Sequence, residues 1–317
     1  MRAHVLSILT SLAIGLTACN GGGSGSGSGL SGSPRAFTRT DSAVTALPNT
    51  SGGYTATQVV TLSNDDAGAS HAAVSLVNVN GNVTSSASSG GYQIQVTLQA
   101  DAPTEAQARA ALATMTVEHR DAVGADTLYL NNEVKFAQYS DDNVNRTATV
   151  TAGLPGTLDY QLHESTVNGT SATSGLGGPE AQLYSTNGSI TLAGAWDVAA
   201  ANTVNGTVSA SGDIASLQAS STTGSVQTAL SGMRDSYADL DSTAGSIDAK
   251  VSRTLTSGFD LEGRSDLGTV AIVVAGTEPV GSPSNSSAHY RSPDYDSGSP
   301  RVRIVAQTSV GSILIHE

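Results

Sequence analysis

The segment from His289 to Asp296 is the densest patch of aromatic and ionisable side chains in the sequence. Imidazole, guanidinium, phenol and carboxylate groups such as these bind polar ligands and transfer protons. Residues 277–300 contain several prolines, so we interpret this stretch as an insertion. It is either a surface loop whose tyrosines pack on the protein or a ligand-contact loop, because binding residues concentrate on loops carried by rigid scaffolds. The candidate contact residues are His289, Tyr290, Arg291, Asp294, Tyr295 and Asp296.

Trp196 and Asp197 are a second candidate site. Trp196 is the only tryptophan of the chain. An exposed indole beside a carboxylate would offer a platform on which a sugar ring could stack. A tryptophan that fills a corner of the fold is the alternative, and the sequence leaves both interpretations open.

Motifs for catalysis or metal binding are missing from the sequence. It contains neither Gly-x-Ser-x-Gly nor His-Glu-x-x-His, and its six histidines show no metal-ligand spacing. The stretch from Asp141 to Asn145 resembles a calcium loop, but Arg146 replaces the required glycine and Ala152 the bidentate acid, so we interpret it as a polar turn. We therefore predict a non-catalytic protein with no metal and no cofactor.

A carbohydrate-active β-helix enzyme, a lyase or a hydrolase, is the alternative, because such enzymes use carboxylates that meet only in the folded chain. The acids near the predicted corners do not recur at the repeat period; they are Asp197, Asp213, Asp235, Asp239, Asp241 and Asp248.

Composition excludes several classes of partner. The net charge is −13 and only 13% of residues are charged, so no basic stripe is available for nucleic acid or for electrostatic binding to anionic lipid. The single cysteine, Cys19, excludes an intrachain disulfide and a cysteine-based zinc site.

The first residues predict a bacterial lipoprotein. A positive start at Arg2 is followed by an apolar run over residues 5–16, which is too short to span a bilayer. The run ends in Leu-Thr-Ala-Cys, which looks like a lipobox, so we predict a signal peptide over residues 1–18 and lipidation of Cys19. Residues 20–33 are almost entirely glycine and serine, and we interpret residues 19–40 as a flexible tether. The expected location is the bacterial cell envelope, with the membrane as a partner through the lipid.

A short pattern recurs through residues 161–317, centred on glycines spaced 18–23 residues apart except for the last interval, which contains the insertion 277–300. Ser or Thr stands three residues before each glycine and directly after it. Val or Ile stands two residues after each glycine, with Ser171 as the exception. Because apolar residues alternate on both sides, each unit is a strand, a corner and a strand. The corner glycines are Gly169, Gly188, Gly206, Gly224, Gly245, Gly268 and Gly311.

The corners distinguish two topologies. Asn-Gly, as at Asn187, suits a type I′ hairpin, in which both central residues have positive φ. Later corners place residues such as Val310 before the glycine, and a β-branched residue resists positive φ. A corner shared by all copies then requires positive φ only of the glycine, as in a type II turn. This favours a β-solenoid or β-helix-like stack over a row of hairpins, with the corner hydroxyls bonded to corner carbonyls.

Residues 41–160 predict a β-rich region with one short helix near residues 104–114. Residues 91–99 alternate as a strand with one apolar face. Thr104 can cap the helix with Gln107 as its partner. Strands are expected again at 115–119, 128–136 and 146–151, and residues 76–83 echo the repeat as an early coil. Together with the stacked repeats, this defines an all-β fold class.

The glycine repeat, residues 104–130 and the segment 289–296 together resemble a bacterial family of β-strand-repeat domains called "putative adhesins", a domain of unknown function. The resemblance covers most of residues 40–317 and implies a solenoid-like cell-envelope protein, and the family repeat carries no known catalytic residues. The chain departs from the family repeat at Ser171, and its last four corners lack the asparagine. We therefore expect adhesin-like binding or envelope scaffolding, with an envelope polysaccharide or a surface protein as the partner. A module that responds to envelope stress is a further alternative, and the oligomeric state stays open.

Overall fold

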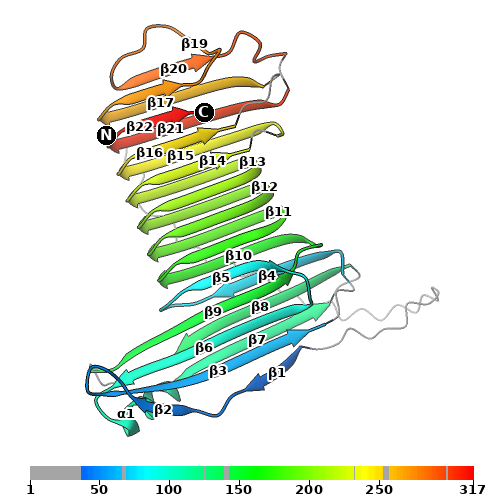
Figure 1. The fold of residues 1–317 in the computed structure, drawn as a ribbon, viewed down its shortest axis with the longest axis vertical. Helices are drawn as coiled ribbons and strands as arrows, with labels where there is room; N and C mark the ends of the chain where they lie inside the picture. Colours follow the sequence, from blue (N-terminus) through cyan, green and yellow to red (C-terminus); the bar gives the residue numbers. More distant parts are fainter. Residues whose placement is uncertain are drawn as a thin grey trace, which may run out of the picture. The chain divides into compact units, whose positions relative to one another are not determined.

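The computed structural model describes residues 37–65, 69–123, 126–138, 143–231, 233–252, 257–297 and 299–317. The predicted signal peptide, the lipidation at Cys19, most of the tether and the start of the Asp141–Asn145 segment lie outside the described residues. Residues 34–317 form one compact unit. Its described part consists of 22 strands, all connected in one hydrogen-bonded sheet, and the helix α1 (Figure 1). The prediction of an all-β protein with one short helix is confirmed.

The strands and the helix are numbered in chain order. The N-terminal part contains β1 (Thr38–Asp41), β2 (Thr45–Pro48), β3 (Tyr54–Asn64), β4 (His71–Val77), β5 (Val83–Ser88), β6 (Tyr92–Ala102), α1 (Glu105–Leu112), β7 (Met115–Val123), β8 (Thr127–Phe136) and β9 (Asn145–Pro155). The repeats contain β10 (Asp159–Asn168), β11 (Ser171–Asn187), β12 (Ile190–Asn205), β13 (Val208–Thr223), β14 (Val226–Leu230), β15 (Ser236–Ala244), β16 (Ile247–Val251), β17 (Gly258–Leu267), β18 (Val270–Val273), β19 (Glu278–Pro279), β20 (Ser287–Arg291), β21 (Arg301–Val310) and β22 (Ile313–His316).

The N-terminal part confirms the expected elements. Alternate residues of β6 are buried, as its pattern predicts. The Thr104 hydroxyl caps α1 by accepting a hydrogen bond from the Gln107 N–H at 3.3 Å, and it donates one to Gln107 Oε1 at 2.8 Å. The apolar stripe of the helix is buried at Ala108, Ala111 and Leu112. β1 already begins at Thr38, so the last residues of the predicted tether are strand.

Each glycine corner joins one strand before it to one strand after it, and we call such a pair of strands a rung. Strands before the corners pair in parallel with one another and form a first layer; strands after the corners form a second layer. The long strands β11, β12 and β13 contribute their first halves to the second layer and their second halves to the first. Buried side chains of both layers form a single apolar core.

Pairing between rungs is parallel and in register. Asn168 is the partner of Asn187, and Asn187 is the partner of Asn205. The strands on the two sides of a corner do not pair as a hairpin would. The asparagines instead bond along the stack: the side-chain amide of Asn187 donates to Asn168 Oδ1, and that of Asn205 to Asn187 Oδ1, each at 2.8 Å. β4 and β5 flank Gly81 and pair in parallel with β10 and β11, so residues 76–83 form a corner between two strands of the stack, as their likeness to the repeat predicts.

The corner glycines lie in a column. A Cβ added to Gly188 would lie 1.8 Å from the carbonyl oxygen of Gly169, and one added to Gly206 would lie 2.3 Å from that of Gly188. The φ angle is 153° at Gly206 and 144° at Gly224, whereas a type II turn has φ near +80° at its glycine. The type II expectation was therefore wrong: glycine is required because the next backbone approaches too closely for any side chain.

Hydroxyl groups join each rung to the next. Every Ser or Thr three residues before a corner glycine donates a hydrogen bond to the glycine carbonyl of the neighbouring rung, at 2.8–3.0 Å. The carbonyl that excludes a side chain from the next glycine is thus the acceptor of this bond. The expectation that corner hydroxyls satisfy corner carbonyls is confirmed. The donors are Thr166, Ser185, Thr203, Ser221, Ser242, Ser265 and Thr308.

The stack does not follow the order of the sequence at its C-terminal end. β21 pairs with β15 on one side and β17 on the other, and β22 lies between β16 and β18 in the same way. Figure 1 shows β21 and β22 in red between the yellow and orange rungs. The last rung of the chain is therefore inserted before the rung that precedes it in sequence. The N-terminal end shows the same feature, because β4 and β5 lie between β8–β9 and β10–β11.

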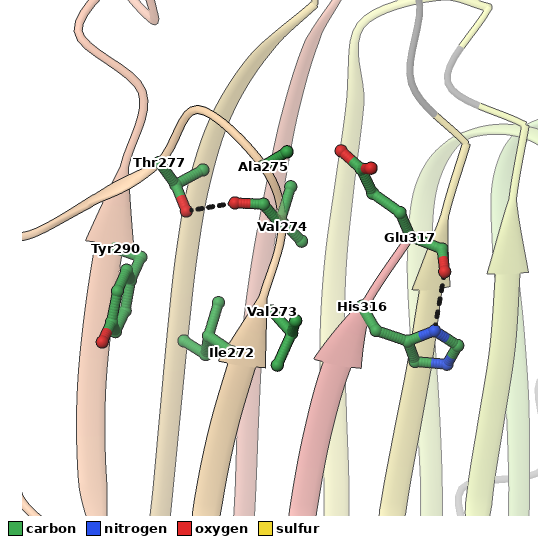
Figure 2. Close-up of a pocket in the computed structure, with 8 residues that line it drawn as sticks. All are labelled: Ile272, Val273, Val274, Ala275, Thr277, Tyr290, His316 and Glu317. Atoms are coloured by element: carbon green, nitrogen blue, oxygen red, sulfur yellow. Dashed lines mark hydrogen bonds between the residues drawn. The ribbon is translucent and has the colours of Figure 1, made fainter.

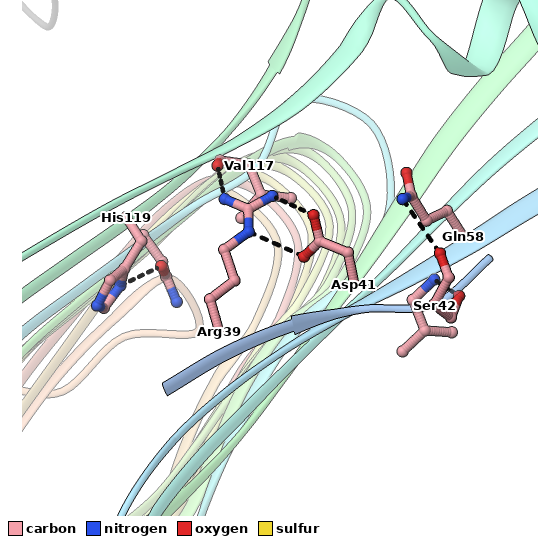
Figure 3. A network of polar contacts seen from close by, with 8 residues as sticks. Arg39, Asp41, Ser42, Gln58, Val117 and His119 are labelled. Atoms are coloured by element: carbon pink, nitrogen blue, oxygen red, sulfur yellow. Dashed lines mark hydrogen bonds and ion pairs between the residues drawn. The ribbon is translucent and has the colours of Figure 1, made fainter. Parts of the chain in front are cut away.

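Both ends of the stack have additional structure. The insertion 277–300 contributes β19 and β20, and β20 pairs antiparallel with β17. At the N-terminal end, β7 continues the first layer, and β6, β3, β1 and β2 continue the second. Arg39 connects these two extensions: its Nη1 donates to the Val117 carbonyl at 2.9 Å, and its Nε and Nη2 bind the carboxylate of Asp41 (Figure 3).

Candidate interaction surface

The outward face of the first layer carries large polar and aromatic side chains in rows that cross the rungs. One row continues from one strand to the next at the same register position: Tyr184, Asn202, Ser220, Asp241, Gln307 and Arg264. Neighbouring side chains in such a row are about 4.8 Å apart. The Ser220 hydroxyl donates to Asn202 Oδ1 at 2.6 Å, which fixes part of the row. The row on the second layer that contains Thr191 has small side chains in its first three rungs, Ala172, Thr191 and Ser209, followed by Gln227, Asp248 and Leu314.

Ring contacts organise the N-terminal part of this face. The rings of His163 and Tyr184 lie 5.7 Å apart and are tilted by 45°. Burial lowers the pKa of His163, although the nearby Glu180 carboxylate opposes this shift. Burial, reinforced by Glu180, raises the pKa of Tyr184. Both groups are therefore neutral near pH 7. An uncharged ligand can contact the two rings without the cost of desolvating a charged side chain.

A polar cluster lies at the C-terminal end of the same face. A nitrogen of His289, Nε2, is 2.6 Å from Asp260 Oδ1, and Nε of Arg303 is 3.8 Å from the other carboxylate oxygen. The guanidinium of Arg303 lies over the ring of Tyr237 at 5.9 Å. Asp260 is thus held between an imidazole and a guanidinium, and the cluster can offer hydrogen bonds and a ring to a polar ligand.

The other predicted contact residues divide into three groups. Arg291 Nη2 donates to Asp296 at 2.6 Å, and its guanidinium lies 4.6 Å over the ring of Tyr295. Asp294 uses its backbone carbonyl to close a turn with Ser297. Tyr290 alternates with its neighbours along β20, so it takes no part in the outward cluster. The sequence missed Asp260, Arg303 and Tyr237, although their alternation on strands marks them as outward-facing.

Tyr290 lines a different feature, a hollow of about 660 Å³ at the end of the second layer (Figure 2). Its other walls are Ile272 to Ala275, Thr277, His316 and Glu317. The Thr277 hydroxyl donates to the Val274 carbonyl at 2.8 Å, which fixes one wall. The segment 289–296 is therefore not one patch: the structure places its side chains on both sides of β20.

Trp196 does not form a sugar platform, because its side chain is 0% exposed. It fills the interior at the bend of β12, in agreement with the alternative interpretation of a corner residue. Asp197 is exposed beside it and binds Arg234 Nη1 at 2.7 Å. Arg234 Nη2 also donates to the backbone carbonyls of Trp196 and Asp213. The arginine thus joins adjacent rungs, and the pair Trp196–Asp197 has a structural role.

Three acids line one hollow at this bend, and Asp159 was not among the acids considered from the sequence. Asp159, Asp197 and Asp213 line a hollow of about 210 Å³ together with Arg234. Arg234 Nε lies 3.4 Å from Asp213 Oδ1. In the described part of the chain, no group of three or more His, Cys, Asp or Glu side chains is arranged to hold a metal ion. None of the described helices has the length and apolarity that a membrane crossing requires.

Among the residues that the structure describes, one carboxyl group lies inside the core. Glu164 is 0% exposed, and burial raises its pKa to about 8, opposed in part by the hydroxyls of Ser85 and Ser171. Ser171 is the residue that departs from the Val or Ile of the repeat. Its hydroxyl donates to Glu164 Oε2 at 2.9 Å.

No family model matches the sequence, and the comparison with curated proteins found no match. The chain is similar to the solved structure of a "putative cell adhesion protein" from Clostridium sporogenes, with 13% identity and a TM-score of 0.39 over 82% of this chain and 99% of that one. A "putative adhesin" from Bacteroides fragilis is 14% identical, with a TM-score of 0.37 over 81% of this chain and 96% of that one. A "Putative lipid binding protein" from Parabacteroides distasonis is 11% identical, with a TM-score of 0.41 over 82% of this chain and 96% of that one.

Proposed function

We propose that this chain is a lipid-anchored protein of the bacterial cell envelope that acts by binding, as an adhesin or a scaffold, and not by catalysis. We further propose that its rungs form a β-solenoid. Parallel pairing in register, the glycine column and the hydroxyl bonds between rungs support this architecture. The proposal for the anchor rests on the lipobox-like sequence that ends at Cys19.

One observation carries the binding proposal: the two layers differ in their outward side chains. The first layer presents phenols, amides, carboxylates and an imidazole in rows, whereas the first three rungs of the corresponding row of the second layer present only methyl and hydroxyl groups, at Ala172, Thr191 and Ser209. Amides and carboxylates bind sugar hydroxyls, and exposed rings stack on the apolar faces of sugars. Tyr237 is 41% exposed and Tyr184 is half-buried, so both rings are accessible. We therefore propose an envelope polysaccharide as the partner, with a surface protein as the alternative.

The test uses residues 34–317, which form one compact unit. Binding is measured on an array of bacterial glycans and by capture from envelope extracts. We expect the double variant Tyr184→Ala, Tyr237→Ala to lose at least about 10-fold in affinity, since each ring contact contributes about 1 kcal/mol. The matched control, Thr191→Ala with Ser209→Ala on the second layer, should bind as the wild type does. Equal loss in both variants, or no binding by the wild type, would contradict the proposal.

Anchoring is tested separately in cells. Cells that express the full chain are grown with an alkyne-labelled fatty acid, and the purified protein is examined for the label. We expect the wild type to be labelled and to enter the detergent phase of an extraction, and the Cys19→Ala variant to do neither. A wild type that carries no label would refute the anchor and leave the binding proposal standing.

A carbohydrate-active enzyme is a second candidate, favoured by the three acids that line one hollow. A glycosidase needs one carboxyl that holds a proton beside one that is ionised. The guanidinium of Arg234 instead forms ion pairs with both Asp197 and Asp213, at 2.7 Å and 3.4 Å. Release of reducing ends from envelope glycans, lost in an Asp213→Asn variant and retained in an Asp294→Asn control, would establish the enzyme.

A further inference from the structure

The two departures from the repeat contact each other. Glu164 occupies the register position that Leu76 and Leu183 hold in the adjacent rungs. Ser171 occupies the position of Val83 and Ile190. The Ser171 hydroxyl donates to Glu164 Oε2 at 2.9 Å across the core, between the first and the second layer. A carboxyl and a hydroxyl thus replace two apolar residues that would otherwise face each other.

The surroundings provide no charge to compensate a carboxylate. Glu164 is 0% exposed, and its Oε1 has no hydrogen-bond partner among the described residues. The inward residues of β4, β5 and β11 at the neighbouring register positions are uncharged: Leu76, Val83, Ser85, Ser171, Thr173 and Leu183. The one inward titratable residue of β10 besides Glu164 is Tyr160, whose hydroxyl donates to the Pro155 carbonyl at 2.6 Å. The other titratable residues of β4, β10 and β11 are His71, Asp159, His163, Glu180 and Tyr184, which alternate to the outward face.

An ionised carboxylate in this place would lose its hydration and would face only the hydroxyls of Ser171 and Ser85. The folded chain therefore favours the protonated form, whereas the unfolded chain ionises in water. We propose that Glu164 and Ser171 form a proton-dependent latch between the two layers: the junction is stable while Glu164 holds its proton, and it is destabilised when that proton leaves because the cost of a buried charge exceeds the gain from the hydroxyl bond. The latch lies in the rung of β10 and β11, where the N-terminal part joins the repeats.

The direction of the pH effect follows from burial. The pKa of Glu164 is raised from 4.5 to about 8. Below pH 4.5, both the folded and the unfolded chain hold the proton. Between pH 4.5 and pH 8, only the folded chain holds it, so the unfolding constant rises with pH by up to about tenfold per unit. Above pH 8, both states are ionised and the dependence ends, which leaves the latch at its weakest.

The latch would make this junction respond to the pH of the surroundings. Near neutral pH the core holds a proton that an alkaline medium removes, and one rung then carries an uncompensated charge. The rungs with an apolar pair at these positions, such as Leu183 with Ile190, lack this response. We expect opening to begin at β10 and the first half of β11.

The test compares urea unfolding of the wild type with that of Glu164→Gln from pH 5 to pH 9. Glutamine keeps the shape and cannot ionise. We expect the ratio of the wild-type unfolding constant to that of the variant to rise at least about 100-fold between pH 5 and pH 8. The control Glu262→Gln, exposed on β17, should leave the ratio constant. A constant ratio for Glu164→Gln would overturn the proposal.

A second variant provides the test if the Glu164→Gln protein does not fold. Glu164→Leu with Ser171→Ile restores the apolar pair of the neighbouring rungs, so it should fold and lack the pH dependence that the wild type shows. Carbon-13 labelling of glutamate side chains provides a direct readout. One carboxyl resonance, lost in either variant, should titrate above pH 7. Titration of that resonance near its ordinary value, or the same pH dependence in the double variant and the wild type, would refute the latch.

Discussion

Gly188 lies against the peptide of Gly169 so closely that a Cβ on Gly188 would stand 1.8 Å from the Gly169 carbonyl oxygen. The same approach recurs from each corner to the next, and the same oxygen accepts the hydroxyl of Ser185 at 2.9 Å. One carbonyl thus both excludes a side chain and binds the neighbouring rung. The corners are where the rungs are fastened together.

Gly188→Ala should lower the free energy of unfolding by about 2–4 kcal/mol, because the methyl group would displace the backbone of the neighbouring rung. Urea unfolding followed by circular dichroism measures this. Gly90→Ala is the control, since nothing lies within 4 Å of a Cβ at Gly90. Equal stability of the two variants would show that the neighbouring rung accommodates the methyl group without a loss of stability.

Ser221→Ala should lower the free energy of unfolding by about 1 kcal/mol. The Ser221 hydroxyl donates to the Gly206 carbonyl at 2.8 Å, and the variant would leave that oxygen without this donor. Ser246→Ala, at an exposed position directly after a corner, should change stability by less than about 0.5 kcal/mol. The urea concentration at the midpoint of unfolding should be lower for Ser221→Ala than for Ser246→Ala. The reverse order would contradict a stabilising role of the hydroxyl bonds between rungs.

Val226→Asp should prevent stable folding of the rungs around it. Val226 is 0% exposed, and an unpaired carboxylate there would lower stability by more than about 3 kcal/mol. Limited proteolysis reports the result as cleavage within residues 190–260. Gln227→Asp, one residue along and facing outward, should remain resistant. Resistance of both variants would contradict the inward assignment of this strand.

Replacing residues 277–297 by a short Gly-Ser link should make the protein self-associate. The deletion removes β20 and leaves the edge of β17 unpaired, and unpaired edges recruit other strands. Light scattering after gel filtration measures the molar mass. The control His289→Ala with Arg291→Ala keeps the backbone of β20 and should elute as the wild type does. Because this control removes the side chains of His289 and Arg291 but keeps β20, an effect seen only in the deletion variant comes from the loss of the strand. If the deletion elutes as the wild type does, β20 does not protect the edge.

Removal of residues 301–317 should release the end of the stack. Without β21 and β22, β17 and β18 lose their partners toward β15 and β16. Hydrogen exchange should then be fast across residues 258–291 and remain slow across residues 190–223. Removal of Glu317 alone should change neither region. Slow exchange across 258–291 in the truncated chain would mean that the two rungs pair directly.

The local structure was predictable because it depends on neighbours in sequence. Alternation around each glycine identified the strands, Thr104 and Gln107 identified the start of the helix, and Gly81 with its flanking residues identified the early rung. The corner angle was not predictable, since the short distance between two backbones replaces the turn geometry that dipeptide preferences describe.

The order of the rungs was not predictable because all corners look alike. A repeat predicts that its copies stack. It does not predict which copies are adjacent, because every copy has the same pattern of glycine, hydroxyl and apolar residues. The interval of 43 residues before Gly311 was the available signal, and it allowed the chain to return past its own previous rung. The candidate loop was misjudged as one patch for a related reason: β20 alternates, so Tyr290 lies on the side opposite to His289.

The pair of Glu164 and Ser171 was half visible in the sequence. Ser171 was recognised as the residue that breaks the apolar column. Glu164, five residues before Gly169, breaks a second column that holds Leu183 and Leu240 in other rungs. Comparing every column of the repeat, and not only the corner, would have identified both.

The inserted rung of β21 and β22 has a consequence for biosynthesis. While a ribosome or an export pore still holds residues 301–317, β17 and β18 have no place to dock, and the sheet behind them ends at β15 and β16. The edge formed by β15 and β16 therefore stays unpaired until β21 and β22 have been made, and unpaired edges recruit other strands. Completion of the fold is timed by the arrival of the final strands.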